Sequence, residues 1–184
     1  MKSFFVILLF FFFYGCKGRD DFKSDLKALQ TRPIILPLDS MQRYNNEGND
    51  TSSCSVKSLK FIVYSDSVEC VSCKLKRMYM WDSLMVKVEK VNIPVGFYFI
   101  FSPKKEDMSM FNFTMETIPP SGFIYVDTTN IFMRINPYIP QNPVMHTFLL
   151  DENNNVLLVG NPLENEKIKK LFWQIVEEKL GKRE

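Results

Sequence analysis

Residues 61–74, with the sequence FIVYSDSVECVSCK, decide which fold the rest of the chain is expected to adopt. The stretch opens with β-branched and aromatic residues typical of a buried strand, which we place at Leu59–Tyr64. Two cysteines, Cys70 and Cys73, follow after a short polar turn. Apolar residues then recur at roughly helical spacing as far as Val88. The sequence therefore predicts a strand, a Cys-x-x-Cys pair and a helix in direct succession.

A strand-to-helix junction is a position at which a thiol becomes reactive. The N-terminus of a helix carries unpaired N–H groups and about half a positive charge, which stabilise a thiolate on Cys70. The pKa of a free cysteine, about 8.5, is lowered in such a place. One turn of helix brings Cys73 close enough to form a disulfide with Cys70. The pattern fits a redox-active pair, and a purely structural disulfide is the alternative.

Strand and helix patterns alternate through the rest of the chain. Further strands are expected at Phe97–Phe101, Phe123–Val126, Thr147–Leu150 and Val156–Val159. Five polar residues between the last two predict an antiparallel hairpin. A short helix is expected at residues 128–135, and an amphipathic helix should begin at Asn161–Glu164 and end at Gly181. This order predicts an α/β domain with a mixed sheet of four to five strands flanked by helices.

The composition excludes several classes of protein. The chain has 184 residues, of which 46% are hydrophobic and 24% charged, so it is neither disordered nor collagen-like. The net charge is only +2, and no basic stripe is present, so we expect no nucleic-acid partner. His146 is the single histidine, which excludes a metal site built from several histidines. We expect no metal and no cofactor.

The N-terminus has the features of a bacterial lipoprotein signal. Lys2 precedes an apolar run from Phe4 to Tyr14, which is too short for a membrane-spanning helix of about 20 residues. The run ends at Gly15-Cys16, which resembles a lipobox, whose cysteine is lipidated after cleavage. We assign residues 1–15 to the signal peptide and Cys16 to lipidation; the alternative is cleavage elsewhere. This predicts a lipid-anchored protein in the envelope of a Gram-negative bacterium, in the periplasm or on the cell surface.

Residues 16–56 are expected to form a tether and a flexible N-terminal segment. The part at Phe22–Leu29 fits a short helix, whereas residues 45–53 contain no apolar side chain and are typical of a loop. We therefore place the folded domain at residues 57–184, with the run PIILP at 33–37 as the part of the tether that could add to the core. Cys54 is an odd thiol, which leaves three roles open: a free thiol, a bridge to another chain, or a second resolving cysteine.

From Leu59 to Leu180 the sequence resembles the thioredoxin-like family, in particular its TlpA/ResA-type membrane-tethered thiol–disulfide oxidoreductases. The stretches that carry the resemblance are FIVYSDSVECVSCK, GFIYVDTTNIFMRIN, and HTFLLDENNNVLLVG with the helix after it. The resemblance implies a three-layer thioredoxin-like fold. It also implies that Cys70 attacks and Cys73 resolves.

The loop before the predicted hairpin departs from the family pattern. In that family a cis-proline lies here against the Cys-x-x-Cys pair and presents its backbone to the substrate, and this position falls on Met145. The resemblance implies that Val144, Met145 and His146 form a substrate-facing loop. We expect Met145 to be trans, because a cis bond before a residue other than proline costs about 3 kcal/mol.

Together these features predict a lipid-anchored, extracytoplasmic thiol–disulfide oxidoreductase. Its partners would be protein thiols or disulfides and a membrane reductant or oxidant. The alternative is a non-catalytic thioredoxin-fold lipoprotein that binds a protein or a ligand, since Met145 occupies the proline position. A third hypothesis is a copper-handling protein, in which the soft cysteine thiolates, Met145 and His146 would bind Cu(I).

Overall fold

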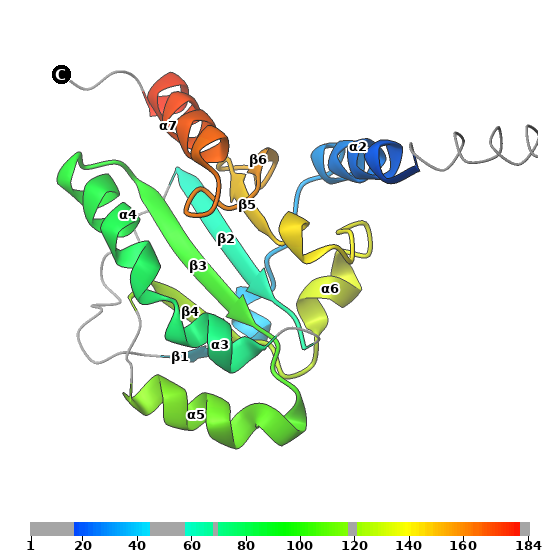
Figure 1. Ribbon diagram of the computed structural model, residues 1–184, viewed down its shortest axis with the longest axis vertical. Coiled ribbons are helices and arrows are strands. Elements are labelled where there is room, and N and C mark those ends of the chain that lie inside the picture. Colours follow the sequence, from blue (N-terminus) through cyan, green and yellow to red (C-terminus); the bar gives the residue numbers. More distant parts are fainter. Residues whose placement is uncertain (1–16, 45–57, 68–69, 118–120, 181–184) are drawn as a thin grey trace, which may run out of the picture.

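The computed structural model describes residues 17–44, 58–67, 70–117 and 121–180. These residues form one mixed sheet of six strands in the order β1-β4-β3-β2-β5-β6 (Figure 1). The strands are β1 (Gln42–Tyr44), β2 (Leu59–Ser65), β3 (Val95–Phe101), β4 (Phe123–Val126), β5 (Thr147–Leu150) and β6 (Val156–Val159).

Helices cover both faces of this sheet. The α-helices are α2 (Lys17–Gln30), α3 (Val71–Lys76), α4 (Tyr79–Lys90), α5 (Met108–Thr117), α6 (Ile131–Ile135) and α7 (Glu166–Leu180). Short 3-10 turns are η2 (Leu38–Ser40), η4 (Lys105–Asp107) and η5 (Pro143–Met145). The single helix expected from Cys73 to Val88 is thus interrupted at Arg77 and Met78, where successive N–H groups bond three residues back.

The strand directions give the thioredoxin-like arrangement. Strands β2, β3 and β4 run parallel, while the hairpin β5–β6 lies antiparallel on the other side of β2. Every residue of β3 is buried, as expected for a strand covered on both faces. The predicted fold class is therefore confirmed. The strand count exceeds the expected four to five because β1 pairs antiparallel with β4 at the edge of the sheet.

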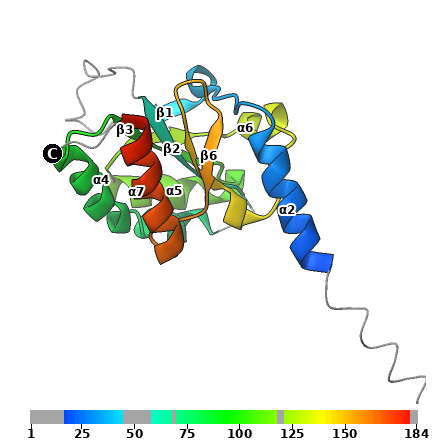
Figure 2. The same ribbon diagram turned by 90° about the horizontal axis from the view of Figure 1, so that it is seen from above.

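Two apolar clusters separate the three layers. The first lies between the sheet and α3, α4, α5 and α7, where the Phe61 ring packs against Trp81, Phe97 and Phe172 at centroid distances of 5.5, 5.6 and 5.7 Å. The second lies between the sheet and α2 and α6, where the Tyr64 ring packs 5.0 Å from Phe132. Figure 2 shows the two sets of helices on opposite sides of the sheet. No helix in the described part of the chain is long and apolar enough to span a membrane.

The segment before residue 45 packs against the sheet, which differs from the tether expected there. Leu29, Ile34 and Met41 are buried in the second cluster. Asn136 at the end of α6 is fully buried and bonds both backbone groups of Ile35 at 2.9 Å. Residues 29–44 therefore add to the folded unit that we expected to begin at residue 57. The predicted boundary falls in residues 45–57, which lie outside the described residues, as do residues 1–16 with Cys16, and Cys54.

Candidate functional site

The two cysteines of the Cys-x-x-Cys pair form a disulfide just beyond the carboxyl end of β2. Their Cα atoms are 5.2 Å apart, and both residues are exposed. Cys70 is the N-cap of α3, and its Sγ accepts a hydrogen bond from the N–H of Cys73 at 3.3 Å. The structure thus places Cys70 at the beginning of the helix, where the sequence predicted it. Because both residues are exposed, a thiol from another molecule can approach the pair.

The loops that follow the three parallel strands are tied together beside this disulfide. The N–H of Ser102 donates to the carbonyl of Ser65 at 2.8 Å, and the N–H of Asp127 donates to the carbonyl of Phe101 at 2.8 Å. The Ser102 hydroxyl donates to the Asp127 carbonyl at 2.9 Å. The Asp127 carboxylate in turn accepts from the first N–H groups of α6, which begins at Ile131, three residues later than the helix expected at 128–135. The edge that carries the disulfide is therefore fixed by buried hydrogen bonds.

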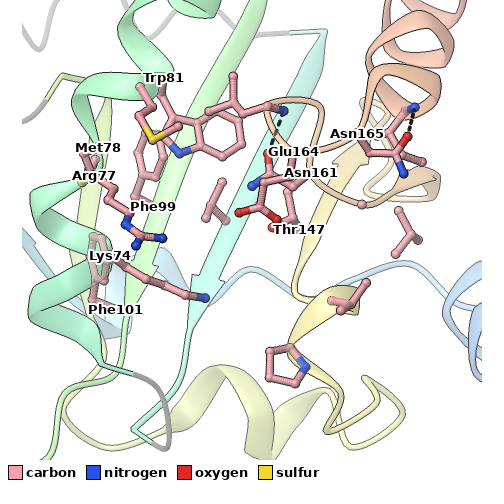
Figure 3. Close-up of a pocket in the computed structure, with 18 of the residues that line it drawn as sticks. Lys74, Arg77, Met78, Trp81, Phe99, Phe101, Thr147, Asn161, Glu164 and Asn165 are labelled. Carbon is pink, nitrogen blue, oxygen red and sulfur yellow. Dashed lines mark hydrogen bonds between the residues drawn. The ribbon is translucent and has the colours of Figure 1, made fainter.

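A cavity of about 730 Å³ lies beside α3, the helix that begins at the Cys70–Cys73 disulfide (Figure 3). Its floor is the sheet, through Val63 on β2 and Phe99 and Phe101 on β3. Its walls come from four other segments, namely the α3–α4 junction (Lys74, Arg77, Met78, Met80, Trp81), η5 and its flank (Pro143, Val144, Thr147), the β6–α7 connection (Gly160, Asn161, Leu163, Glu164, Asn165) and Phe22 of α2. Lys74, the residue after Cys73, is the lining residue nearest to the disulfide along the chain.

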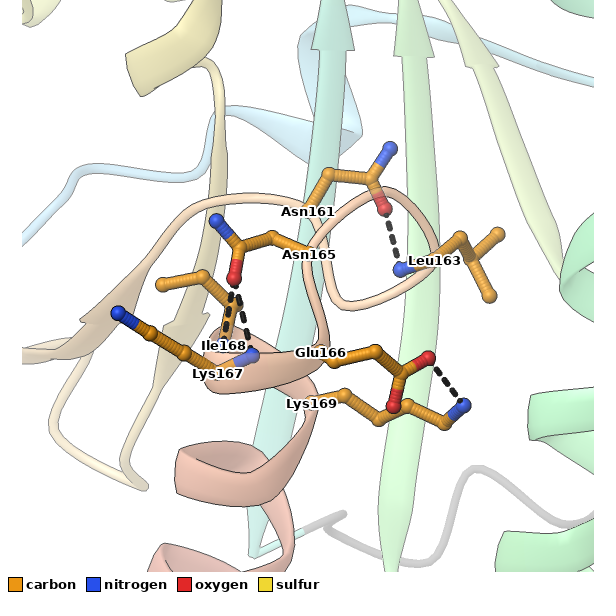
Figure 4. Close-up of polar contacts among 7 residues, drawn as sticks. All are labelled: Asn161, Leu163, Asn165, Glu166, Lys167, Ile168 and Lys169. Atoms are coloured by element: carbon orange, nitrogen blue, oxygen red, sulfur yellow. Dashed lines mark hydrogen bonds and ion pairs between the residues drawn. The ribbon is translucent and has the colours of Figure 1, made fainter.

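The late beginning of α7 gives the cavity one of its walls. The chain leaves β6 at Gly160, whose φ of +119° is one that residues with a side chain rarely adopt. The Oδ1 of Asn161 then accepts the N–H of Leu163 at 2.9 Å, and Asn165 caps the helix through the N–H of Lys167 at 2.9 Å (Figure 4). The expected start of the helix at Asn161–Glu164 was therefore wrong, and these residues form a polar loop at the cavity.

The predicted substrate-facing loop contributes only part of its side chains to the cavity. Val144 is 64% exposed and lines the cavity, whereas Met145 and His146 are fully buried. The His146 ring packs 5.2 Å from Tyr64, its Nε2 lies 2.9 Å from the carbonyl of Pro140, and its Nδ1 has no partner among the described residues. The side chains of Met145 and His146 thus point into the second cluster and do not face a substrate.

The backbone of this loop is held by hydrogen bonds instead of by a cis-proline. The Oδ1 of Asn142 accepts the N–H of Val144 at 3.1 Å, and its carbonyl accepts the N–H of Met145 at 2.9 Å. None of the described peptide bonds is cis, so Met145 is trans, as predicted. The carbonyl of His146 accepts the N–H of Tyr64 at 2.9 Å, which ties the loop to β2.

The described residues bring together no group of three or more His, Cys, Asp or Glu side chains that could hold a metal ion. The copper hypothesis required Met145 and His146 to meet the two cysteines. Both side chains are instead buried in the core, so these four residues do not form a common site.

The sequence alone predicted neither the cavity nor the contribution of Phe22. The available signal was the spacing of Phe22, Leu26 and Leu29, which places three apolar side chains on one face of a helix. The sequence could not show that this face lies against the domain. Trp81 and Met78 are buried in the first cluster and also line the cavity.

No family model matches the sequence, and no curated protein matches it either. Solved structures similar to this chain include a proposed thiol:disulfide interchange protein DsbE from Chlorobium tepidum, with a TM-score of 0.49, 18% identity, and coverage of 68% of this chain and 84% of that chain. An uncharacterized thioredoxin-like protein from Porphyromonas gingivalis has a TM-score of 0.49 and 15% identity over 82% and 97% of the two chains. A domain of a possible thiol-disulfide isomerase from Cytophaga hutchinsonii has a TM-score of 0.45 and 15% identity over 67% and 80%. The fold assignment itself rests on the strand order and directions given above.

Proposed function

We propose that this protein is a thiol–disulfide oxidoreductase that exchanges disulfides with protein substrates through Cys70 and Cys73. The observation that carries the proposal is the exposed Cys70–Cys73 disulfide at the strand-to-helix junction after β2. A disulfide that only stabilised the fold would gain little here, because a loop closed over three residues restricts the unfolded chain less than a long loop does.

The geometry supports Cys70 as the attacking cysteine. With the disulfide formed, the N–H of Cys73 donates to the Cys70 sulfur at 3.3 Å, and the same hydrogen bond kept on reduction would stabilise a thiolate on Cys70. The Cys70 thiolate attacks one sulfur of a substrate disulfide, and the other substrate sulfur leaves as a thiolate. The Cys73 thiolate then attacks Cys70, which breaks the mixed disulfide and releases the second substrate thiolate. Two electrons pass from the protein to the substrate, and the reverse sequence oxidises a substrate dithiol.

We further propose that the protein is lipid-anchored through Cys16 in the envelope of a Gram-negative bacterium. The support is the apolar run that ends at Gly15-Cys16 and the resemblance of these residues to a lipobox. An envelope compartment outside the cytoplasm allows disulfides to form and persist, which fits an exposed cysteine pair. The partners proposed there are protein thiols or disulfides and a membrane reductant or oxidant that restores the pair after each exchange.

The test of the exchange chemistry is the capture of a covalent intermediate. Cys73→Ser leaves Cys70 without its resolving partner, so mixed disulfides with substrate proteins should accumulate and disappear on reduction. The matched control is Cys70→Ser, which should capture nothing, and both variants are made together with Cys54→Ser to remove the odd thiol. If Cys73→Ser captures no more protein than Cys70→Ser, the proposal fails, and the non-catalytic binding protein becomes the better account of this fold and its cavity.

A further inference from the structure

Helix α2 presents one apolar face to the rest of the protein. Phe22, Leu26 and Leu29 follow the i, i+4, i+7 spacing that places side chains on the same face of a helix. Leu29 is fully buried and Leu26 packs against the second cluster, so the end of the helix is fixed on the domain. Phe22 lies seven residues earlier, about 10 Å along the helix at 1.5 Å per residue. It is 42% exposed and lines the cavity.

The rim of the cavity carries exposed apolar side chains as well as polar and charged ones. Three large apolar side chains on it are exposed, and they come from three separate elements: Phe22 at 42%, Met80 at 43% and Val144 at 64%. They continue into the apolar floor formed by β2 and β3. Exposed apolar side chains at the mouth of a cavity are available to pack against a bound partner. The charged groups at the cavity have mixed signs, with Lys74 and Arg77 on one wall and Glu164 on another.

We propose that the cavity receives a large apolar side chain of the substrate polypeptide, close to the cysteine that exchanges with Cys70, and that Phe22 determines part of this specificity. The inference rests on the proposed function. A substrate bonded to Cys70 carries its next one to three residues within about 10 Å of that sulfur, at up to 3.6 Å per residue. That length allows them to extend toward the cavity, since Lys74, the residue after Cys73, lies on its wall. Mixed charges at the rim suit a polypeptide better than a ligand with a single anionic group.

The experiment uses the full-length protein, reduced and held in detergent. Two peptides, each with one cysteine bonded to glutathione, differ only in having Leu or Gly two residues from that cysteine. We expect the Leu peptide to oxidise the protein about 10-fold faster at low concentration, which is the size of effect that one apolar side chain produces in a pocket. The difference should appear in the half-saturating concentration of peptide rather than in the maximal rate.

Two variants assign this preference to the cavity. Phe22→Ala should reduce the ratio of the Leu rate to the Gly rate at least about 3-fold, because it removes one wall. Val63→Phe, which fills the cavity from its floor, should reduce the ratio to about one, with folding checked by circular dichroism. The matched control is Lys23→Ala, which changes an exposed neighbour on α2 and should keep the ratio of the unmodified protein.

Oxidised glutathione alone separates the two proposals, since it presents no large apolar side chain. If it oxidises the protein but the two peptides react at equal rates, the specificity inference is overturned and the exchange function stands. If neither glutathione nor the peptides oxidise the protein, both fail. Binding of a fatty-acid anion such as dodecanoate can be measured through the fluorescence of Trp81. If dodecanoate binds and the two peptides react at equal rates, the inference is overturned in favour of a small-molecule site.

Discussion

Replacing Asn136 with Ala should release the segment around Ile35 from the body of the protein. Asn136 is fully buried, and its Oδ1 accepts the N–H of Ile35 at 2.9 Å. Its Nδ2 donates to the carbonyl of Ile35 at 2.9 Å and to the carbonyl of Phe132 at 2.8 Å. One side chain therefore joins the end of α6 to a segment 101 residues earlier in the chain.

The expected loss follows mainly from these three hydrogen bonds, because the Tyr138 hydroxyl, which also lies 2.9 Å from the Asn136 Oδ1, keeps the carbonyl of Pro33 at 2.6 Å. Each contributes about 1 kcal/mol to the free energy of unfolding, and a buried polar group left without a partner costs about 1–3 kcal/mol. The Phe132 carbonyl keeps the backbone N–H of Asn136 at 3.2 Å, so its loss is small. Ile35 is 54% exposed, so water replaces part of what its backbone loses. We therefore expect Asn136→Ala to lower the free energy of unfolding by about 2–3 kcal/mol.

The assay is urea unfolding of the full-length protein, together with hydrogen exchange of the Ile35 amide. Exchange at Ile35 should become faster in Asn136→Ala, and the amide of Ile34, which donates to Asn154 at 2.9 Å, should follow. The matched control is Asn112→Ala, an exposed asparagine on α5, which should change stability by less than about 0.5 kcal/mol. If Asn136→Ala behaves like this control, residues 29–44 are a tether after all.

Three further outcomes are expected. Burial raises the pKa of Asp151, but hydrogen bonds from Asn155 and Asn153 outweigh the effect of burial and hold the pKa below its usual value. The ionised carboxylate therefore stabilises the fold above about pH 4. This stabilisation is lost as the pH falls through the lowered pKa. Urea midpoints measured between pH 7 and pH 3 should fall less steeply for Asp151→Asn, and an unchanged slope would contradict the assignment. Phe61→Ala should lower the free energy of unfolding by about 3–5 kcal/mol, measured by urea unfolding, because the ring is fully buried among three other aromatic rings; a loss below about 1 kcal/mol would argue against this core. Cys16→Ala should move the protein from the detergent phase to the aqueous phase on phase partitioning, whereas unchanged partitioning would disprove the lipid anchor.

Local patterns were sufficient to predict the strands that lie in the core. The continuous apolar run at Phe97–Phe101 predicted β3, and the five polar residues after Leu150 predicted the β5–β6 hairpin. The cysteine pair was placed correctly because its position depends only on the strand before it and the helix after it. These elements carry their own hydrophobic or turn signals, so no knowledge of distant contacts was needed.

Features that depend on distant contacts could not be predicted. β1 has only three residues, Gln42–Tyr44, and becomes a strand because β4 offers it an edge. The run PIILP at 33–37 was recognised as one that could add to the core, but its partners were not: Ile34 packs in the second cluster, and Asn136, far away in sequence, bonds the backbone of Ile35. The cavity has its floor on the sheet and walls from four other segments, and no single segment indicates it.

The residues of the η5 loop show the same limit at the scale of single side chains. The resemblance to a known family predicted that Val144, Met145 and His146 face the substrate. Only packing against Tyr64 and the second cluster decides that Met145 and His146 turn inward, and this leaves Val144 at the cavity.

The reduction potential of the Cys70–Cys73 pair tests the central claim most directly. The protein, carrying Cys54→Ser, is equilibrated in glutathione and dithiothreitol buffers, and the fraction of free thiol is measured at each potential. Exchange proteins of the kind proposed have potentials between about −120 and −270 mV, and we predict a reversible two-electron transition in this range. A potential below about −300 mV, typical of structural disulfides, would contradict the account.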